Sequence, residues 1–280
     1  MANSMHLECP IEALVRVESL SKCYVSGGRW TKRTTIEAVH EASFEIQPGQ
    51  TTALVGPSGC GKSTIARCVA RLERPDSGRI WLEGQEIAHL EGQPLNAIRM
   101  RVQMIFQDAV TSLNPRFSAA EAIEEPLRIR GCDRLERREI AEAVMQDVAL
   151  SPSWLDRSVM NFSGGQRQRL AIARALTTRP KLLILDEAFA GLDLSTQAQI
   201  ANLLLELQKS HALSYLLISH DLTLVAAMAS SVAVMSKGSV VENRLTPEIL
   251  ANPLHEETKK LVASARAAEL KLTLKAGASG

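Results

Sequence analysis

The stretch "GPSGCGKST", Gly56–Thr64, decides the fold of this 280-residue chain. It fits the pattern G-x-x-x-x-G-K-[ST], and it lies between an apolar run, "TTALV", and a helical pattern over Ser63–Leu72. Glycines let the backbone curl so that several N–H groups converge on phosphates, Lys62 adds a mobile positive charge, and the Ser63 hydroxyl can ligate Mg²⁺. A glycine-rich connection without a ligand is the alternative, but it would need neither the strand before it nor the helix after it.

Composition limits the class of protein. With 45% hydrophobic and 22% charged residues, the chain can bury the core of one large domain, or of a domain plus a lobe. The formal net charge of +1 supplies no overall basic field and argues against a DNA-binding role. The start, "MANSMHLECP", is unlike a secretory signal, and no apolar run is long enough to span a bilayer, so we expect a cytoplasmic protein. Five irregularly spaced cysteines, with no C-x-x-C pair, indicate free thiols.

Short apolar runs alternate with helical patterns along the chain. Strands separated by helices favour parallel pairing and an α/β core. Residues 114–150 are helical in pattern without strands, which predicts a helical subdomain inserted into that core. The expected strands are "ALVRVESL", "TTALVG", "KLLILD" and "SYLLISH", and the expected helices after Ser63–Leu72 are Gly164–Thr178 and Ser195–Ser210.

Polar residues end three of these apolar runs. In "KLLILDE", Asp186 is placed to hold Mg²⁺ and Glu187 is the candidate base that activates water. An acidic pair can also be a plain strand-to-loop boundary, but the phosphate loop upstream favours chemistry. His220, in "LLISHD", and Gln107, in "VQMIFQ", end two more runs, where open α/β sheets place their ligands. Taken alone, either residue would be an ordinary turn residue.

The order of these motifs resembles that of the nucleotide-binding subunit of an ATP-binding cassette (ABC) transporter. The phosphate loop is followed by Gln107, "SGGQ" at Ser163–Gln166, "LLILDE", "GLD" at Gly191–Asp193 and His220. The resemblance covers residues 14–265, and "SGGQ" is specific to this superfamily. It implies that the "SGGQ" turn, called the signature turn below, caps the ATP held by a partner subunit in a head-to-tail dimer with two shared sites.

The resemblance also implies a role for each motif residue. Tyr24 would stack on adenine, although an ordinary half-buried strand aromatic is the alternative. Lys62, Gln107, Glu187 and His220 would be catalytic, and Ser63, Gln107 and Asp186 would hold Mg²⁺. The triphosphate would be held by Gly56, Pro57, Ser58, Gly59, Cys60, Gly61, Lys62, Ser63 and Thr64. The residues acting in trans, on the partner's ATP, would be Ser163, Gly164, Gly165, Gln166 and Asp193.

The implied fold is a P-loop NTPase (RecA-like) α/β core with an N-terminal antiparallel β subdomain and an inserted α-helical subdomain. Residues 1–13 would form an N-terminal arm, and residues 14–110 with 180–245 the core and the β subdomain. Residues 111–179 would form the helical signature subdomain, and residues 246–280 a family-specific C-terminal helix and tail.

Two segments resemble the peptide and nickel importer ATPases in particular. "FQDAVTSLNPRFSAAEAIEEPL" is similar to their "FQDP-x-x-SLNPR" segment, and "TPEILANPLHEETKKLVASA" to their closing element. In that family the helical subdomain receives a coupling helix of the membrane subunit, which makes Asn114, Pro115 and Arg116 candidates for the transmission surface. An ordinary Asn-Pro turn is the alternative.

The resemblance implies an importer ATPase at the cytoplasmic face of the inner membrane. Its partners would be two transmembrane permease subunits, a second ATPase subunit (a heterodimer is favoured, a homodimer is possible) and, indirectly, an extracytoplasmic binding protein, with no nucleic acid. A long loop after Tyr24, and Ala188 where relatives have proline, favour nickel or a metal chelate as cargo. A di- or oligopeptide is the alternative. Outside transport, a nucleic-acid-associated ABC-type ATPase and a P-loop switch or kinase stay open.

Overall fold

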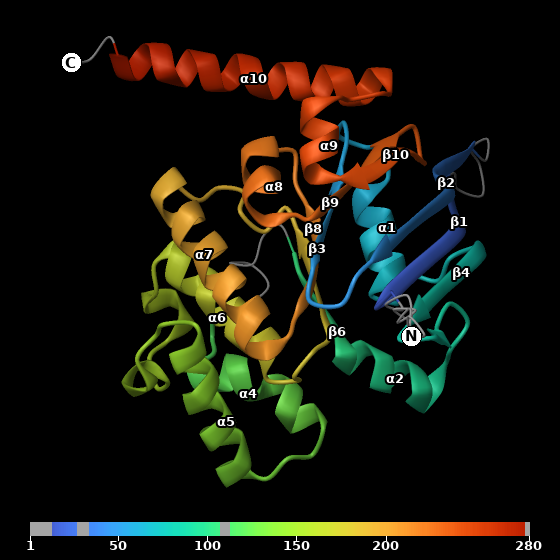
Figure 1. Cartoon of the computed structure of the whole chain (residues 1–280). Helices are drawn as coiled ribbons and strands as arrows, with labels where there is room; N and C mark the ends of the chain where they lie inside the picture. The colour runs from blue at the N-terminus through green and yellow to red at the C-terminus, as the bar shows by residue number, and fades with distance from the viewer. Residues whose placement is uncertain (1–12, 27–33, 107–112, 278–280) are drawn as a thin grey trace, which may run out of the picture.

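The central element is a six-stranded sheet. A computed structural model of the chain describes residues 13–26, 34–106 and 113–277. Within them, β3, β6, β7, β8 and β9 run parallel, and β10 is antiparallel to β9 (Figure 1). The order across the sheet is β10 (Ser239–Leu245), β9 (Ser231–Ser236), β3 (Thr51–Val55), β8 (Ser214–Ile218), β7 (Leu182–Asp186) and β6 (Val102–Ile105).

Both faces of this sheet are buried. Along β7, Leu183 and Leu185 face one apolar cluster, and Leu182 and Ile184 face the other. This alternation has the period of a strand, and burial on both sides explains why the sequence reads as unbroken apolar runs. The sheet is therefore the middle layer of the molecule.

An antiparallel sheet and α1 cover one face. This sheet runs in the order β2 (Thr34–Ile46), β1 (Val15–Ser26), β4 (Ser77–Leu82) and β5 (Gln85–Glu86). Helix α1 (Lys62–Val69) lies between the two sheets, and α2 (Gly92–Arg101) leads into β6 (Figure 1). The phosphate loop connects β3 to α1 and therefore lies at the carboxyl ends of the parallel strands of the central sheet.

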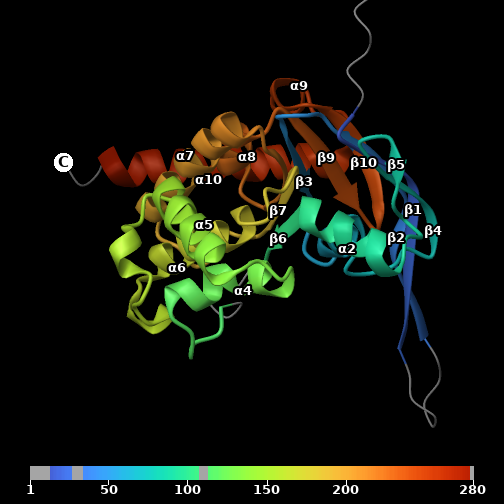
Figure 2. The same cartoon turned by 90° about the horizontal axis from the view of Figure 1, so that it is seen from below.

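Helices cover the other face (Figures 1 and 2). They are α4 (Ala119–Ile129), α5 (Arg134–Asp147), α6 (Gly164–Leu176), α7 (Leu194–His211) and α8 (Leu222–Met228), with short 3₁₀ turns at Pro152–Trp154 and Val159–Asn161. Strands alternate with helices as expected, and the predicted fold class is confirmed. None of the helices in the described part of the chain has the length and hydropathy needed to cross a bilayer.

Helix α1 ends earlier than the sequence pattern indicates. We expected it to reach Leu72, but it ends at Val69. Arg71 has a positive φ of 54°, and the Leu72 N–H donates to the Arg67 carbonyl over 2.9 Å. This bond closes a terminal turn of the kind that satisfies the last carbonyls of a helix.

Cys60 and Cys68, like Cys23 and Cys132, carry free thiols, as predicted.

The carboxylate of Glu242 anchors the C-terminal helices α9 (Thr246–Ala251) and α10 (Glu256–Gly277). Glu242 is buried, and it accepts from the N–H groups of Leu254 (3.2 Å) and His255 (2.9 Å), just before α10 begins. A buried anion at a helix start is favourable because the first N–H groups have no partner within the helix. The bonds join the edge strand β10 to the C-terminal segment.

Candidate functional site

The glycine-rich loop after β3 is pressed against neighbouring backbone at two points. Gly56 has φ 152° and Gly61 has φ 107°. A side-chain carbon at Gly56 would lie 2.3 Å from the Met235 carbonyl oxygen, and one at Gly61 would lie 2.2 Å from that of Ala38. The left-handed backbone and these close approaches restrict both positions to glycine. The backbone of Met235 and Ala38 therefore packs against one side of the loop and fixes its conformation.

The other side of the same loop presents backbone groups and the Lys62 ammonium. Gly59 has φ 76°, and an added carbon there would meet nothing within 4 Å. The buried Lys62 ammonium donates to the carbonyl oxygens of Gly56 (2.9 Å) and Pro57 (3.0 Å), and its contact with Cys60 Sγ is 3.8 Å. The loop thus holds a positive charge beside its N–H groups, as binding of an anionic phosphate requires.

The Ser63 hydroxyl lies against the acidic end of β7. It donates to Asp186 Oδ1 over 3.0 Å, and Asp186 is 6% exposed. Burial raises the pKa of Asp186, the Ser63 bond opposes that rise, and the neighbouring Glu187 charge adds to it. A hydroxyl and a carboxylate oxygen are hard donors of the kind that suit Mg²⁺.

This donor pair fits an ion that arrives with phosphates. Within residues 13–26, 34–106 and 113–277, no group of three or more His, Cys, Asp or Glu could hold a metal alone. Mg²⁺ commonly takes one or two protein ligands and completes its shell with phosphate oxygens and water. Gln107, the third predicted ligand, lies outside the described residues.

Glu187 and His220 line one hollow of about 220 Å³, which is also lined by Gln197 and Ser219. The Glu187 backbone has a positive φ of 48°, and its N–H donates to the Ile218 carbonyl at the end of β8 over 3.1 Å. A non-glycine residue in this conformation is strained, and such strain gathers at functional sites. The adjacent ends of β7 and β8 thus bring together the predicted base and the predicted γ-phosphate sensor.

Tyr24, on β1, is half-buried beside α1. Its hydroxyl forms a short hydrogen bond with the Glu73 carboxylate, and the Lys22 ammonium lies 5.8 Å from its ring centroid. Burial and the Glu73 carboxylate raise the pKa of Tyr24, whereas a hydrogen bond with Thr64 in α1 opposes the rise. The ring is thus close to the helix that follows the phosphate loop, and the sequence did not reveal its partner Glu73.

The signature turn caps its own helix. Ser163 Oγ accepts from the Gln166 N–H over 3.3 Å, and Gln166 Oε1 accepts from the Ser163 N–H over 2.9 Å, a capping box at the start of α6. Phe162, just before the turn, is buried and packs edge-on against Trp154, with ring centroids 6.1 Å apart. Among the described residues, no hydrogen bond joins this turn to the phosphate loop.

The family comparison identifies the chain. The family described as "ABC transporter" matches residues 39–190. The chain belongs to the ABC transporter family. Its curated relatives include the "Probable peptide ABC transporter ATP-binding protein y4tS" of Sinorhizobium fredii, which is 46% identical over 257 residues, 91% of this chain and 73% of that protein. The "Oligopeptide transport ATP-binding protein AppF" of Bacillus subtilis is 40% identical, over 90% of this chain and 78% of that protein.

Solved structures of ABC proteins share the fold. The dimeric structure of a post-hydrolysis state of the ATP-binding cassette MJ0796, bound to ADP and Pi, superposes with a TM-score of 0.72. Its sequence is 26% identical, and the match covers 83% of this chain and 98% of that one. The cbiO1 protein of Clostridium perfringens gives a TM-score of 0.74 at 27% identity, over 86% of this chain and 91% of that one. The chain is accordingly an ABC ATPase.

Sequence reasoning missed a groove of about 620 Å³ in this ABC ATPase, between the central sheet and the helical layer. Its lining comes from the segment just after α1 and from α2, β6, α4 and α6, and it includes Arg99, Gln103, Phe106, Pro126 and Arg174. The Arg174 guanidinium pairs with a Glu125 carboxylate oxygen over 2.7 Å, which links α6 to α4 along the groove. No local pattern marks the groove, because its walls are far apart in sequence.

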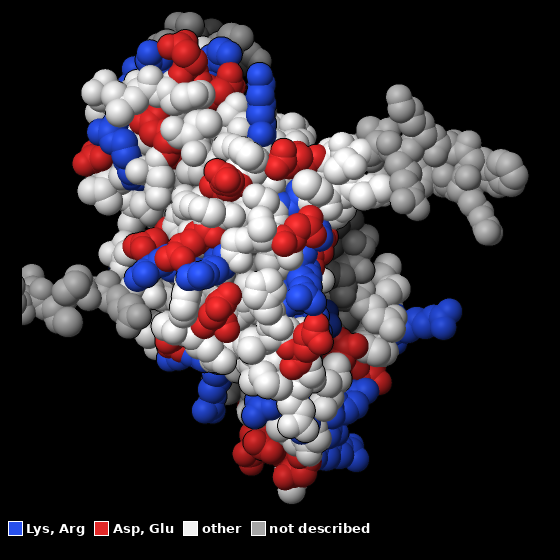
Figure 3. Space-filling view, turned by 90° about the vertical axis from the view of Figure 1, so that its right-hand side faces the viewer, with Lys and Arg blue, Asp and Glu red and all other residues white. Residues whose placement is uncertain are grey.

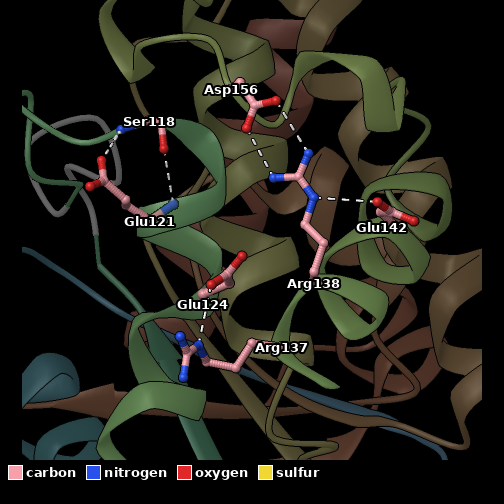
Figure 4. Close-up of polar contacts among 7 residues, drawn as sticks. All are labelled: Ser118, Glu121, Glu124, Arg137, Arg138, Glu142 and Asp156. Atoms are coloured by element: carbon pink, nitrogen blue, oxygen red, sulfur yellow. Dashed lines mark hydrogen bonds and ion pairs between the residues drawn. The ribbon is translucent and has the colours of Figure 1, made fainter. Parts of the chain in front are cut away.

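A polar network fixes the two outer helices of the helical layer (Figure 4). Arg138 on α5 donates to both carboxylate oxygens of Asp156 (3.0 and 3.3 Å) and also pairs with Glu142. Arg137 pairs with Glu124 of α4 over 3.3 Å. The pairs tie α5 to α4 and to the segment that leads into the signature turn.

The "NPR" segment before α4 is an exposed turn. Asn114 Oδ1 accepts from the Arg116 N–H, and the Asn114 carbonyl accepts from the Phe117 N–H, both over 3.0 Å. Asparagine commonly starts such turns. The geometry accounts for Asn114 and Pro115 as turn residues and leaves the Arg116 side chain exposed.

Proposed function

We propose that this chain is the ATP-hydrolysing motor subunit of a binding-protein-dependent ABC importer of the peptide/nickel family. The observation that carries the proposal is the 3.0 Å bond between Ser63 and Asp186, beside the Lys62 ammonium. It joins the phosphate loop to the acidic strand end, as a nucleoside triphosphate site with a divalent ion requires. A P-loop switch or kinase gives no task to the signature turn.

In this proposal the phosphate loop holds the triphosphate of ATP. Its N–H groups bind phosphate oxygens, and Lys62 moves from the loop carbonyls to the β- and γ-phosphates. Ser63, Asp186 and Gln107 would hold Mg²⁺, which when bound neutralises charge on the phosphates. Tyr24 supplies a ring for adenine, held in orientation by Glu73.

Glu187 acts on the attacking water. Its carboxylate lines the same hollow as His220, so a water placed there can give its proton toward Glu187 while the His220 ring bonds the γ-phosphate. The backbone bond from Glu187 to the Ile218 carbonyl fixes the relative position of the two strand ends. Loss of either side chain should therefore lower the hydrolysis rate more than it lowers ATP affinity.

The signature turn and Asp193 serve the partner's ATP in a head-to-tail dimer. Support comes from the turn's own hydrogen bonding: the capping box uses the N–H groups of Ser163 and Gln166. The other N–H groups of a first helical turn have no partner within the helix and can bind an anion of another molecule. The related cassette MJ0796 is described as dimeric. We infer that this chain pairs with a sister ATPase, and self-pairing is the second candidate.

The groove between the sheet and the helical layer would receive a coupling helix from one of the two permease subunits. Its volume of about 620 Å³ and mixed apolar and charged lining suit an amphipathic helix end. Arg116 is exposed in the turn before α4 and does not line this groove, so its place in the proposed contact rests on the family resemblance. Docking of this kind would hold the chain at the cytoplasmic face of the inner membrane as a peripheral subunit.

We infer a short peptide as the cargo of the importer. The relatives y4tS and AppF are named for peptide and oligopeptide transport, and the DppF protein of Pseudomonas aeruginosa, 40% identical over 91% of this chain, is named for di/tripeptide transport. Nickel or a metal chelate, which Ala188 favours, is the second candidate. The binding protein outside the membrane, and not this chain, would select between them.

A role on nucleic acid is not proposed. The face seen in Figure 3 carries basic and acidic side chains interspersed, without the broad basic surface that binds a phosphate backbone. The net charge of +1 agrees with this.

The proposal is tested by purifying the tagged chain from membranes. We expect two polytopic membrane proteins and a second ATPase to co-purify, with ATP turnover stimulated by the loaded binding protein. Deletion should abolish uptake of short peptides while nickel uptake continues. Loss of nickel uptake with peptide uptake unchanged would identify nickel as the cargo. ATP turnover that is stimulated by DNA, without membrane partners, would contradict the transport function.

A further inference from the structure

Gly165 of the signature turn lies close to Thr196 in the first turn of α7. A side-chain carbon built on Gly165 lies 2.6 Å from Thr196 Cγ2, whereas Thr196 Cβ and Oγ1 are each 3.9 Å from it. Gly165 lies in the first turn of α6 and has no positive φ, so its backbone does not itself require glycine. The Thr196 methyl group is therefore what restricts this position within the chain.

The Thr196 side chain is itself held in place. Its hydroxyl donates to Asp193 Oδ2 over 2.7 Å, and its N–H donates to Asp193 Oδ1 over 2.9 Å. Asp193 is the N-cap of α7, and these bonds to Thr196 lower the pKa of its carboxyl. Because threonine is branched at Cβ, fixing the hydroxyl also fixes the methyl group. One side chain thus bonds Asp193 with one branch and packs on Gly165 with the other.

The next residue continues this link toward the predicted base. Gln197 Nε2 donates to the carbonyl oxygens of Phe189 and Leu192, each over 3.1 Å. The Ala190 N–H donates to the Glu187 carbonyl over 3.0 Å. The segment from Glu187 to Asp193 is thereby folded onto the first turn of α7.

We propose that Thr196 is a positioning residue that holds the signature turn and Asp193 as one rigid unit, so that both reach the partner's nucleotide in a fixed relation. The inference rests on the proposed function, in which both segments act in trans. Thr196 acts through Gly165 and Asp193 and does not itself contact ATP. It follows that Thr196 by itself restricts position 165 to glycine, independently of the space that the partner's phosphate needs.

Substitutions can separate the role of the Thr196 hydroxyl from that of its methyl group. Thr196→Ser keeps the hydroxyl and removes the methyl group, whereas Thr196→Val keeps a methyl group and removes the hydroxyl. Gly165→Ala places a carbon 2.6 Å from the wild-type methyl group and must displace the turn. In the Thr196→Ser background the nearest atoms of residue 196 are 3.9 Å away, so the added carbon fits.

The experiment measures ATP turnover by the full chain with its sister subunit, for the wild type, the three single variants and Gly165→Ala/Thr196→Ser. Gly165→Ala should lower kcat by about a hundredfold, as a displacement of about 1 Å does. The double variant should recover to within about threefold of Thr196→Ser, and Thr196→Val should lose about tenfold in kcat. ATP affinity, measured by fluorescent nucleotide binding, and thermal unfolding should change little in all four.

A double variant as slow as Gly165→Ala would overturn the inference, because the added carbon would then obstruct the partner's nucleotide. A kcat of Thr196→Val equal to that of the wild type would also overturn the inference. A wild-type chain without ATP turnover would instead contradict the proposed function. Amide hydrogen exchange of residues 163–167 then decides the inference: it should speed up in Gly165→Ala and return to normal in the double variant, and unchanged exchange in Gly165→Ala would overturn it.

Discussion

The Ser63 hydroxyl donates to the Asp186 carboxylate over 3.0 Å, across 123 positions of sequence. The bond joins the first turn of α1 to the last residue of β7. A buried carboxylate is costly without partners, and the Ser63 hydroxyl supplies one for Asp186. The pair therefore marks where the phosphate loop and the acidic strand end act together.

Replacing Asp186 with Asn should weaken the Mg²⁺-dependent part of ATP binding. The amide oxygen can still accept from Ser63, but the negative charge that attracts the ion is lost. We expect the affinity for ATP with Mg²⁺ to fall about tenfold, or about 1.4 kcal/mol, and the affinity in EDTA to stay unchanged. Fluorescent ATP titration measures both. Exposed Glu256→Gln is the matched control, and equal affinities of Asp186→Asn and wild type in Mg²⁺ would contradict the assignment.

Two glycines of the phosphate loop should differ in their effect on stability. Gly59→Ala meets no neighbour within 4 Å and adds only the strain of φ 76°, about 1 kcal/mol. Gly61→Ala adds a carbon 2.2 Å from the Ala38 carbonyl oxygen, so overpacking raises the loss to about 3 kcal/mol. Urea unfolding compares the two variants. Equal midpoints would show that the loop is not pressed against its neighbours as described.

The C-terminal segment should loosen in acid because of Glu242. Burial alone would raise the pKa of this carboxyl, but the hydrogen bonds that it accepts, the strongest from the His255 N–H, together outweigh burial and lower the pKa. A lowered folded-state pKa stabilises the fold above the usual Glu value of about 4.3, and this contribution is lost as pH falls toward the lowered pKa.

Glu242→Gln should remove that pH dependence. The variant should unfold at a lower temperature than the wild type at pH 7, and the difference should shrink as pH falls below about 4. Melting curves from pH 3 to 7 test this, with limited proteolysis near residues 246–256 as a second readout. A constant difference across this range would mean that the Glu242 charge does not anchor α10.

Sequence reasoning reached the parts of the site that local pattern encodes. The phosphate loop, the acidic pair and His220 each follow a short apolar run, and parallel strands bring such ends to one sheet edge, so the Ser63–Asp186 contact could be expected. The Gly165–Thr196 contact could not, because packing between two helices has no local signature. For the same reason the groove beside α4 and α6, and Glu73 as the partner of Tyr24, became visible only in three dimensions.

The central claim is that ATP is bound between two subunits and hydrolysed with the help of Glu187. The most direct test is the molar mass of purified Glu187→Gln protein, alone and with its sister subunit, by light scattering with and without Mg²⁺ and ATP. We predict that ATP converts the variant to a stable dimer of about twice the mass, with turnover abolished. A variant that stays monomeric in ATP and hydrolyses it at the wild-type rate would contradict the account.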